Sequence, residues 1–140
     1  MHSQGLVSLK QKFSNYQKAL LSLEEILEKI ESKRHDEDFK IYRDSAIKRF
    51  EYSLEVARKL MSKYIEFVDK KINGQKLVLK KAFEFDLIED KIWFIMIDDR
   101  NLTTHEYSEE LEEELLVSIY TYAIKLKEFY NVIESKIDEL

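Results

Sequence analysis

The chain has no proline and only two glycines, Gly5 and Gly74, among its 140 residues. β-Sheets need tight turns, and turns depend on the backbone conformations that glycine and proline supply. So low a content of both residues favours long helices joined by few loops. We therefore expect an all-α fold, and the length fits one domain covering residues 1–140.

Apolar residues recur every three or four positions along three long segments, as they do on the buried face of a helix. These segments cover residues 6–30, 39–68 and 111–137. Two shorter helices are expected at residues 76–85 and 90–99. Helices this long gain their stability by packing an amphipathic face against a neighbour. The sequence therefore predicts an antiparallel up-and-down helical bundle of three long and two short helices.

Three polar sites are expected to mark helix ends. Asp36 or Asp38 can accept the free N–H groups at the start of the second helix. The pair Asn73-Gly74 tolerates the left-handed backbone that often ends a helix, so we expect the second helix to end there. Ser108 is a typical N-cap, and the two glutamates after it favour the helix dipole.

Composition excludes several classes of protein. The chain has no cysteine, which rules out disulfides, thiolate metal sites and cysteine nucleophiles. The longest apolar run, residues 92–97, is far shorter than the roughly 20 residues of a membrane span. We see neither a secretory signal nor a glycine-rich phosphate loop, and we expect a cytoplasmic protein.

Acidic residues between positions 86 and 99 could in principle hold Mg²⁺ through oxygen ligands. Their spacing shows no ligand pattern, so we interpret them as helix caps and solvated groups, and we expect no metal and no cofactor. The residues are Asp86, Glu89, Asp90, Asp98 and Asp99.

Charge is distributed unevenly along the chain, whose net charge is −5. Residues 33–81 contain 14 Lys and Arg against 8 Asp and Glu, a net charge of +6. Residues 82–114 contain 2 Lys and Arg against 12 Asp and Glu, a net charge of −10. This division indicates one face suited to phosphate and another suited to a basic partner, although two solvated helix faces would give the same pattern.

Arg100 and His105 are the residues best suited to chemistry. An arginine can bind a phosphate, and a histidine titrates near neutral pH. Together they could cleave RNA without a metal: the ribose 2′-hydroxyl attacks the phosphorus, the histidine moves a proton, and the arginine neutralises the developing charge. The alternative interpretation is a capping histidine and a salt-bridged arginine.

On an unbroken helix, Arg100 and His105 would point about 140° apart. Asn101, Thr103 and Thr104 lie between them and are poor helix formers, because their side chains compete for backbone hydrogen bonds. We therefore expect the helix to loosen here, so that both side chains turn toward one cleft.

Several stretches of the sequence carry a family resemblance. They are residues 12–23, 47–55, 81–83, 87–90 and Trp93 followed by residues 99–107. Together they resemble the nucleotidyltransferase substrate-binding proteins of the HEPN superfamily over nearly the whole chain. The sequence departs from the family pattern at Ala57-Arg58, where Trp-Lys is usual, and near Gln75, where a proline is usual.

The resemblance implies a homodimer whose gene partner is a minimal nucleotidyltransferase. Related HepT-type members are ribonuclease toxins with an Arg-x4-His-x-Tyr motif at the dimer interface, and the nucleotidyltransferase is an antitoxin that adds AMP to the motif tyrosine. By this resemblance Arg100 would bind the scissile phosphate, His105 would move the proton, and Tyr107 would be the modified residue. Asn101 and Thr104 match the polar interior of the motif.

Dimerisation also agrees with the composition. The chain has 17 aromatic residues, so an amphipathic bundle has apolar surface to spare, and a twofold axis would bring two Arg–His pairs together. Besides Arg100, we expect Arg43, Lys48 and Arg49 to line the cleft and to bind RNA or a nucleotide.

Three hypotheses remain open at this point. The first is a metal-independent endoribonuclease, the toxin of a two-gene toxin–antitoxin pair. The second is a non-catalytic subunit that binds a nucleotide or the substrate of the nucleotidyltransferase. The third is a helical adaptor whose acidic residues 109–114 dock a basic partner.

Overall fold

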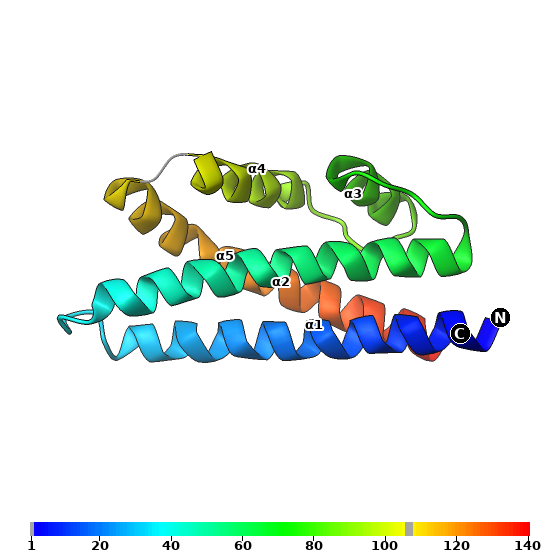
Figure 1. Cartoon of the computed structure of the whole chain (residues 1–140), viewed down its shortest axis with the longest axis horizontal. Helices are drawn as coiled ribbons and strands as arrows, with labels where there is room; N and C mark the ends of the chain where they lie inside the picture. The colour runs from blue at the N-terminus through cyan, green and yellow to red at the C-terminus, as the bar shows by residue number, and fades with distance from the viewer. Residues whose placement is uncertain (1, 106–107) are drawn as a thin grey trace.

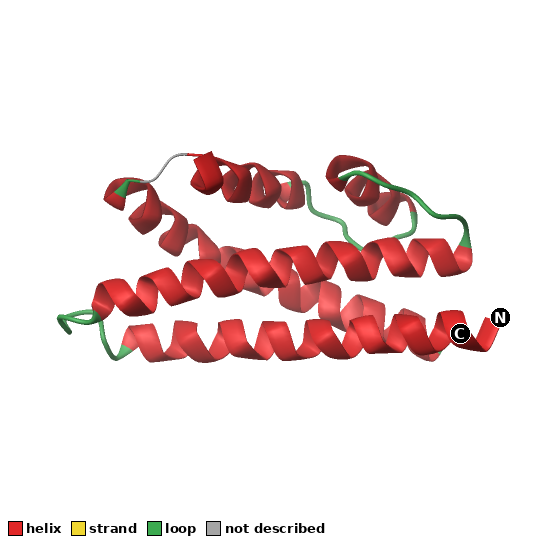
Figure 2. Cartoon of the chain, viewed as in Figure 1, coloured by secondary structure: helices red, strands yellow, loops and turns green. Residues whose placement is uncertain are grey.

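The computed structural model describes residues 2–105 and 108–140 of the chain. Over these residues the regular structure consists of helices, which confirms the predicted all-α class (Figure 2). The predicted count of three long and two short helices is also confirmed. The helices are α1 (His2–Glu31), α2 (Phe39–Val68), α3 (Gln75–Glu84), α4 (Ile92–His105) and α5 (Glu109–Asp138).

The helices form an antiparallel bundle (Figure 1). α1 and α2 lie side by side as a hairpin, and α5 crosses behind them at an angle. The short helices α3 and α4 run along the opposite side of α2 from α1. Both chain termini therefore lie at the same end of the bundle.

Heptad spacing explains how α1 enters the core. Leu9, Tyr16, Leu23 and Ile30 are seven residues apart, which places them on one helix face, and all four are fully buried. The hydroxyl of Tyr16 donates a hydrogen bond of 2.6 Å to the carbonyl of Leu126 on α5. This bond satisfies the one polar atom that the buried ring brings into the core.

A second part of the core lies where α4 meets α5. Trp93 of α4 is 2% exposed and packs edge-on against Phe129 of α5, with ring centroids 5.7 Å apart. Phe94 of α4 stacks on Phe83 of α3 at 5.8 Å. These rings hold α4 against both α5 and α3.

Ser108 caps α5 as predicted. Its side chain accepts a hydrogen bond of 3.1 Å from the backbone N–H of Leu111. The start of α2 differs from the prediction, because Asp38 occupies the N-cap position without a side-chain cap bond. The carboxylate of Asp36 accepts from the N–H of Asp38 instead, at 2.8 Å.

The predicted end of α2 at Asn73-Gly74 is wrong. The helix ends at Val68, because the exposed residues 69–71 that follow offer no apolar face to bury. Gly74 still uses a left-handed conformation, with φ of 98°, but it does so at the start of α3. None of the helices within the described residues is long and apolar enough to cross a membrane.

Candidate functional site

Helix α4 carries the predicted catalytic residues, and its second half is held from two sides. The hydroxyl of Tyr122 on α5 donates a hydrogen bond to the carboxylate of Asp99. Lys76 at the start of α3 lies 3.7 Å from the carboxylate of Asp98. The bond to Tyr122 anchors the helix directly before Arg100, whereas the Lys76–Asp98 pair is exposed and contributes little.

The expected loosening of the helix after Arg100 is wrong. α4 continues without interruption through Asn101 and Thr104 to His105. The low helix propensity of asparagine and threonine is overcome by the contacts that anchor α4 to α3 and α5. Positions 100 and 105 therefore lie about 140° apart around the helix axis.

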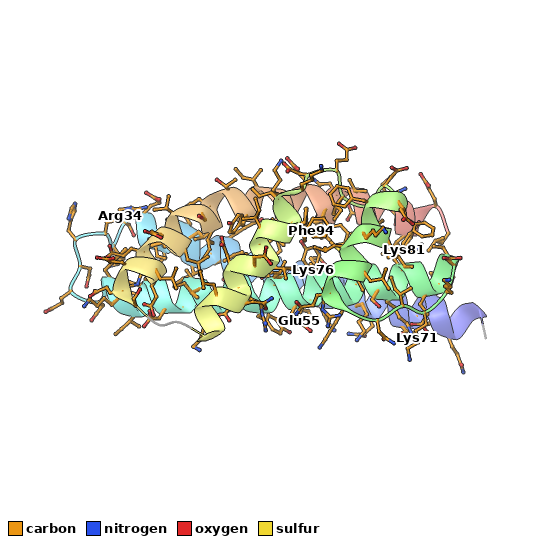
Figure 3. All side chains as sticks on the ribbon, turned by 90° about the horizontal axis from the view of Figure 1, so that it is seen from above. Arg34, Glu55, Lys71, Lys76, Lys81 and Phe94 are labelled. Carbon is orange, nitrogen blue, oxygen red and sulfur yellow. The ribbon has the colours of Figure 1, made fainter. Side chains whose placement is uncertain are left out.

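Arg100 is half-buried where α4 passes α2, close to a group of charged residues on α2. Arg58 holds Glu55 there with a contact of 2.6 Å between Nη2 and Oε1. The pKa of the Glu55 carboxyl is lowered, chiefly by its hydrogen bond from Arg58 and further by the positive charges of Lys59 and Arg100. Figure 3 shows α4 lying across α2, with Glu55 labelled along α2.

This arrangement concentrates positive charge beside the predicted catalytic arginine. Three cations, Arg58, Lys59 and Arg100, act on a single carboxylate, Glu55. Sequence reasoning missed the two cations on α2. The departure from the family pattern at Ala57-Arg58 was the available signal, because it places a longer, planar cation at this point of the helix.

The structure places Arg43 in an ion cluster between α2 and α5. Its side chain is 4% exposed, and Nη2 lies 2.8 Å from the Glu112 carboxylate. Nη1 lies 3.6 Å from Glu113 and 3.9 Å from Glu109. Arg43 therefore fastens the start of α5 to α2. The same contacts give internal partners to three of the acidic residues that the adaptor hypothesis assigned to docking.

Lys48 and Arg49 line a groove between α1 and α2, with a volume of about 520 Å³. The described residues that line it come from these two helices, so Arg100 is not among them. The groove and the surroundings of Arg100 are therefore separate parts of the described surface.

The remaining predicted residues lie around the connection from α4 to α5. Asn101 is half-buried on α4. Thr104 and His105 form the end of α4. Tyr107 lies outside the described residues. Ser108, the next described residue, caps α5.

Of the acidic residues interpreted as helix caps, Asp90 plays that role at the start of α4. Asp90 accepts a hydrogen bond of 3.0 Å from the backbone N–H of Ile92. That bond, followed by one from Lys125, lowers the pKa of the Asp90 carboxyl. Lys125 lies 3.1 Å from Asp90 and 3.3 Å from Glu128, beside a hollow of about 840 Å³. Among residues whose placement is described, no three His, Asp or Glu side chains gather closely enough to hold a metal ion.

Comparison with known proteins decides the family. The model of the family described as "Nucleotidyltransferase substrate binding protein like" matches residues 11–135. The chain belongs to this family. The match spans all five helices, which confirms the resemblance found in the sequence and associates the chain with a nucleotidyltransferase, as the family description implies.

A solved structure supports the fold independently. The chain is similar to a crystal structure of a protein from Thermus thermophilus, with 29% sequence identity and a TM-score of 0.69. The similarity covers 83% of this chain and 96% of that one. No curated protein matches the chain significantly.

Proposed function

We propose that this substrate-binding-type protein is the toxin of a two-gene pair in the cytoplasm, a metal-independent endoribonuclease that its nucleotidyltransferase partner neutralises. The observation that carries the proposal is the position of Arg100. It is half-buried on an anchored helix, in a cationic group with Arg58 and Lys59, and five residues before His105. A half-buried guanidinium in such a field suits a phosphate.

The proposed reaction is a transesterification within the RNA. The 2′-hydroxyl attacks the neighbouring phosphorus, the bond from phosphorus to the 5′-oxygen breaks, and a 2′,3′-cyclic phosphate and a 5′-hydroxyl result. His105 removes the proton of the 2′-hydroxyl, and an imidazolium protonates the leaving oxygen. Arg100 stabilises the charge on the equatorial oxygens, while Asn101 and Thr104 bind the neighbouring nucleotide.

A homodimer completes this mechanism. Positions 100 and 105 of one chain face different directions around α4, so a twofold partner would supply the group that each half-site lacks. Two histidines then allow one to act as base while the other acts as acid. Regulation follows in the same proposal: the partner transfers AMP from ATP to the hydroxyl of Tyr107, and pyrophosphate leaves.

The test uses purified protein and a labelled single-stranded RNA in EDTA. We expect cleavage that leaves a 2′,3′-cyclic phosphate, and no cleavage of the same RNA with 2′-methoxy groups. Arg100→Ala and His105→Ala should each abolish the products, whereas Lys80→Ala, an exposed lysine on α3, should not. Products that persist in both site variants would refute this assignment.

A second candidate function is a subunit that binds the nucleotidyltransferase's substrate or a nucleotide and breaks no bond. The uninterrupted course of α4 favours it, because a binding site does not require Arg100 and His105 to meet. Calorimetry with nucleotides, with and without the partner, tests this function. Absence of binding together with strong RNA cleavage would eliminate it.

A further inference from the structure

The groove between α1 and α2 is built from two matching rows of residues. Each helix contributes positions i, i+3, i+4 and i+7, the spacing that keeps residues on one helix face. Three of the lining side chains are small: Ala19 and Ser22 of α1 and Ser45 of α2. The lining residues are Asn15, Lys18, Ala19 and Ser22 of α1, and Ser45, Lys48, Arg49 and Tyr52 of α2.

The groove is positively charged. Lys18, Lys48 and Arg49 contribute three positive charges, and the lining contains no carboxylate. None of the three cations forms an ion pair within the part of the chain that the structure describes. By contrast, Arg43 and Arg58 on the same helix are both paired with carboxylates. The charge of this groove is therefore available to an anion.

Arg49 is held in place without losing its charge. Its Nη1 donates a hydrogen bond of 2.8 Å to the backbone carbonyl of Ser22, which joins the two sides of the groove. A neutral acceptor occupies one of its five N–H donors and leaves the planar fork oriented. An oriented fork suits the oxygens of a phosphate, which guanidinium binds through paired hydrogen bonds.

Tyr52 supplies an aromatic surface at the end of the α2 row. The residue is 60% exposed, so its ring is open to a ligand. An exposed aromatic ring beside cations is the combination on which proteins stack nucleobases while they bind the phosphates. Asn15 and Ser45 add amide and hydroxyl groups that can bond a sugar or a base edge.

From these observations we propose that the α1–α2 groove binds a nucleoside phosphate. Its phosphates contact Lys18, Lys48 and Arg49, and its base stacks on Tyr52. The volume of about 520 Å³ lies within the range of roughly 300–1,000 Å³ that is typical of small-molecule sites. This site is separate from Arg100, so it binds its ligand whether or not the protein cleaves RNA.

A nucleoside phosphate could be a free nucleotide or part of an RNA strand, and the experiment uses a probe for each. ATP is titrated by calorimetry, and a fluorescein-labelled 2′-methoxy RNA of 12 nucleotides is titrated by anisotropy. That RNA cannot be cleaved by attack of a 2′-hydroxyl, so the result is independent of the proposed nuclease. Both titrations contain EDTA and are repeated at several salt concentrations.

The test variant is Lys18→Gln/Lys48→Gln, which removes two exposed charges without breaking an ion pair. Its matched control is Lys70→Gln/Lys80→Gln, which makes the same change at exposed positions outside the groove. Tyr52→Leu removes the ring but keeps an apolar side chain. Circular dichroism should show the same helix content for all variants.

We expect saturable binding of at least one probe. Binding of ATP shows that the groove accepts a free nucleotide, and binding of the RNA shows that it accepts a strand. Tyr52→Leu should weaken binding about tenfold through lost stacking. For RNA, the lysine pair should lower the slope of log K against log salt by about 1.4, because each neutralised phosphate contributes about 0.7. The proposal is overturned if neither probe binds, or if both lysine pairs weaken binding equally.

Discussion

Replacing Arg43 by methionine tests whether the ion cluster between α2 and α5 holds the bundle together. Methionine keeps most of the length and volume of the side chain but removes the charge. In the native chain the guanidinium is 4% exposed, and it lies 2.8 Å from Glu112, whose side chain is 14% exposed. The substitution would leave the Glu112 carboxylate mostly buried without its cation.

The size of the effect follows from that burial. Removing one partner of a buried ion pair costs about 3–5 kcal/mol. Glu112 keeps some contact with water, and Glu109 and Glu113 are more than half exposed, so we expect the lower limit, about 3 kcal/mol. For a domain of this size the loss should lower Tm by about 10 °C.

The double variant Arg43→Met/Glu112→Leu gives the second half of the test. Nε and Nη1 of Arg43 are buried and make no hydrogen bond within the described residues, so the native pair is incompletely satisfied. Replacing an entire buried pair by apolar side chains is often neutral or stabilising. We expect the double variant to lie within about 1 kcal/mol of the native chain.

Denaturant unfolding followed by the fluorescence of Trp93 measures both variants. Trp93 is the single tryptophan and is 2% exposed, so its emission reports loss of the core. If the free energy of unfolding of Arg43→Met is within about 0.5 kcal/mol of the native value, the ion cluster contributes little to stability. If the double variant is the less stable of the two, the unpaired Glu112 carboxylate is not the cause of the loss in Arg43→Met.

Two further predictions concern the anchors of α4 and α5. Tyr122→Phe should destabilise the chain by about 1–2 kcal/mol through loss of the bond to Asp99, measured by the same unfolding assay. Burial, and then that bond, raise the pKa of Tyr122 to about 12, so the native state holds this proton more tightly than the unfolded state. The contribution of the Tyr122 hydroxyl to stability is complete below its ordinary pKa of 10.0 and is lost as the pH rises toward 12. The free energy of unfolding should therefore change less between pH 9 and pH 11 for Tyr122→Phe than for the native chain. An equal change in both proteins would contradict this assignment. Ser108→Ala should cost about 1 kcal/mol and Ser108→Gly only a few tenths, which is the usual ranking at an N-cap; thermal melts that rank the two variants in the opposite order would disprove the cap.

The helices could be predicted from local pattern, but their contacts could not. Apolar spacing located the start of α2 at Phe39, and Ser108 located the start of α5, because each signal depends on residues that are close together in sequence. Whether Arg43 meets solvent, RNA or Glu112 depends on the register of α2 against α5. Those two residues are 69 positions apart, and periodicity contains no information on that register.

The candidate site shows the same limit. Sequence propensity predicted a looser helix after Arg100, whereas tertiary anchors such as the bond between Tyr122 and Asp99 keep it regular. The position of Arg100 beside Glu55 and Arg58 likewise arises from the packing of α4 on α2. Local rules fail where distant contacts supply more free energy than propensity does.

The rate of RNA cleavage in EDTA, measured for four proteins, tests the central claim most directly. The proteins are the native chain, Arg100→Ala, His105→Ala and the double variant. If both residues serve one transition state, each single substitution should lower the rate at least about 100-fold, and the double substitution should lower it little further. A native chain that leaves RNA intact, or single variants that cleave at the native rate, would contradict the account.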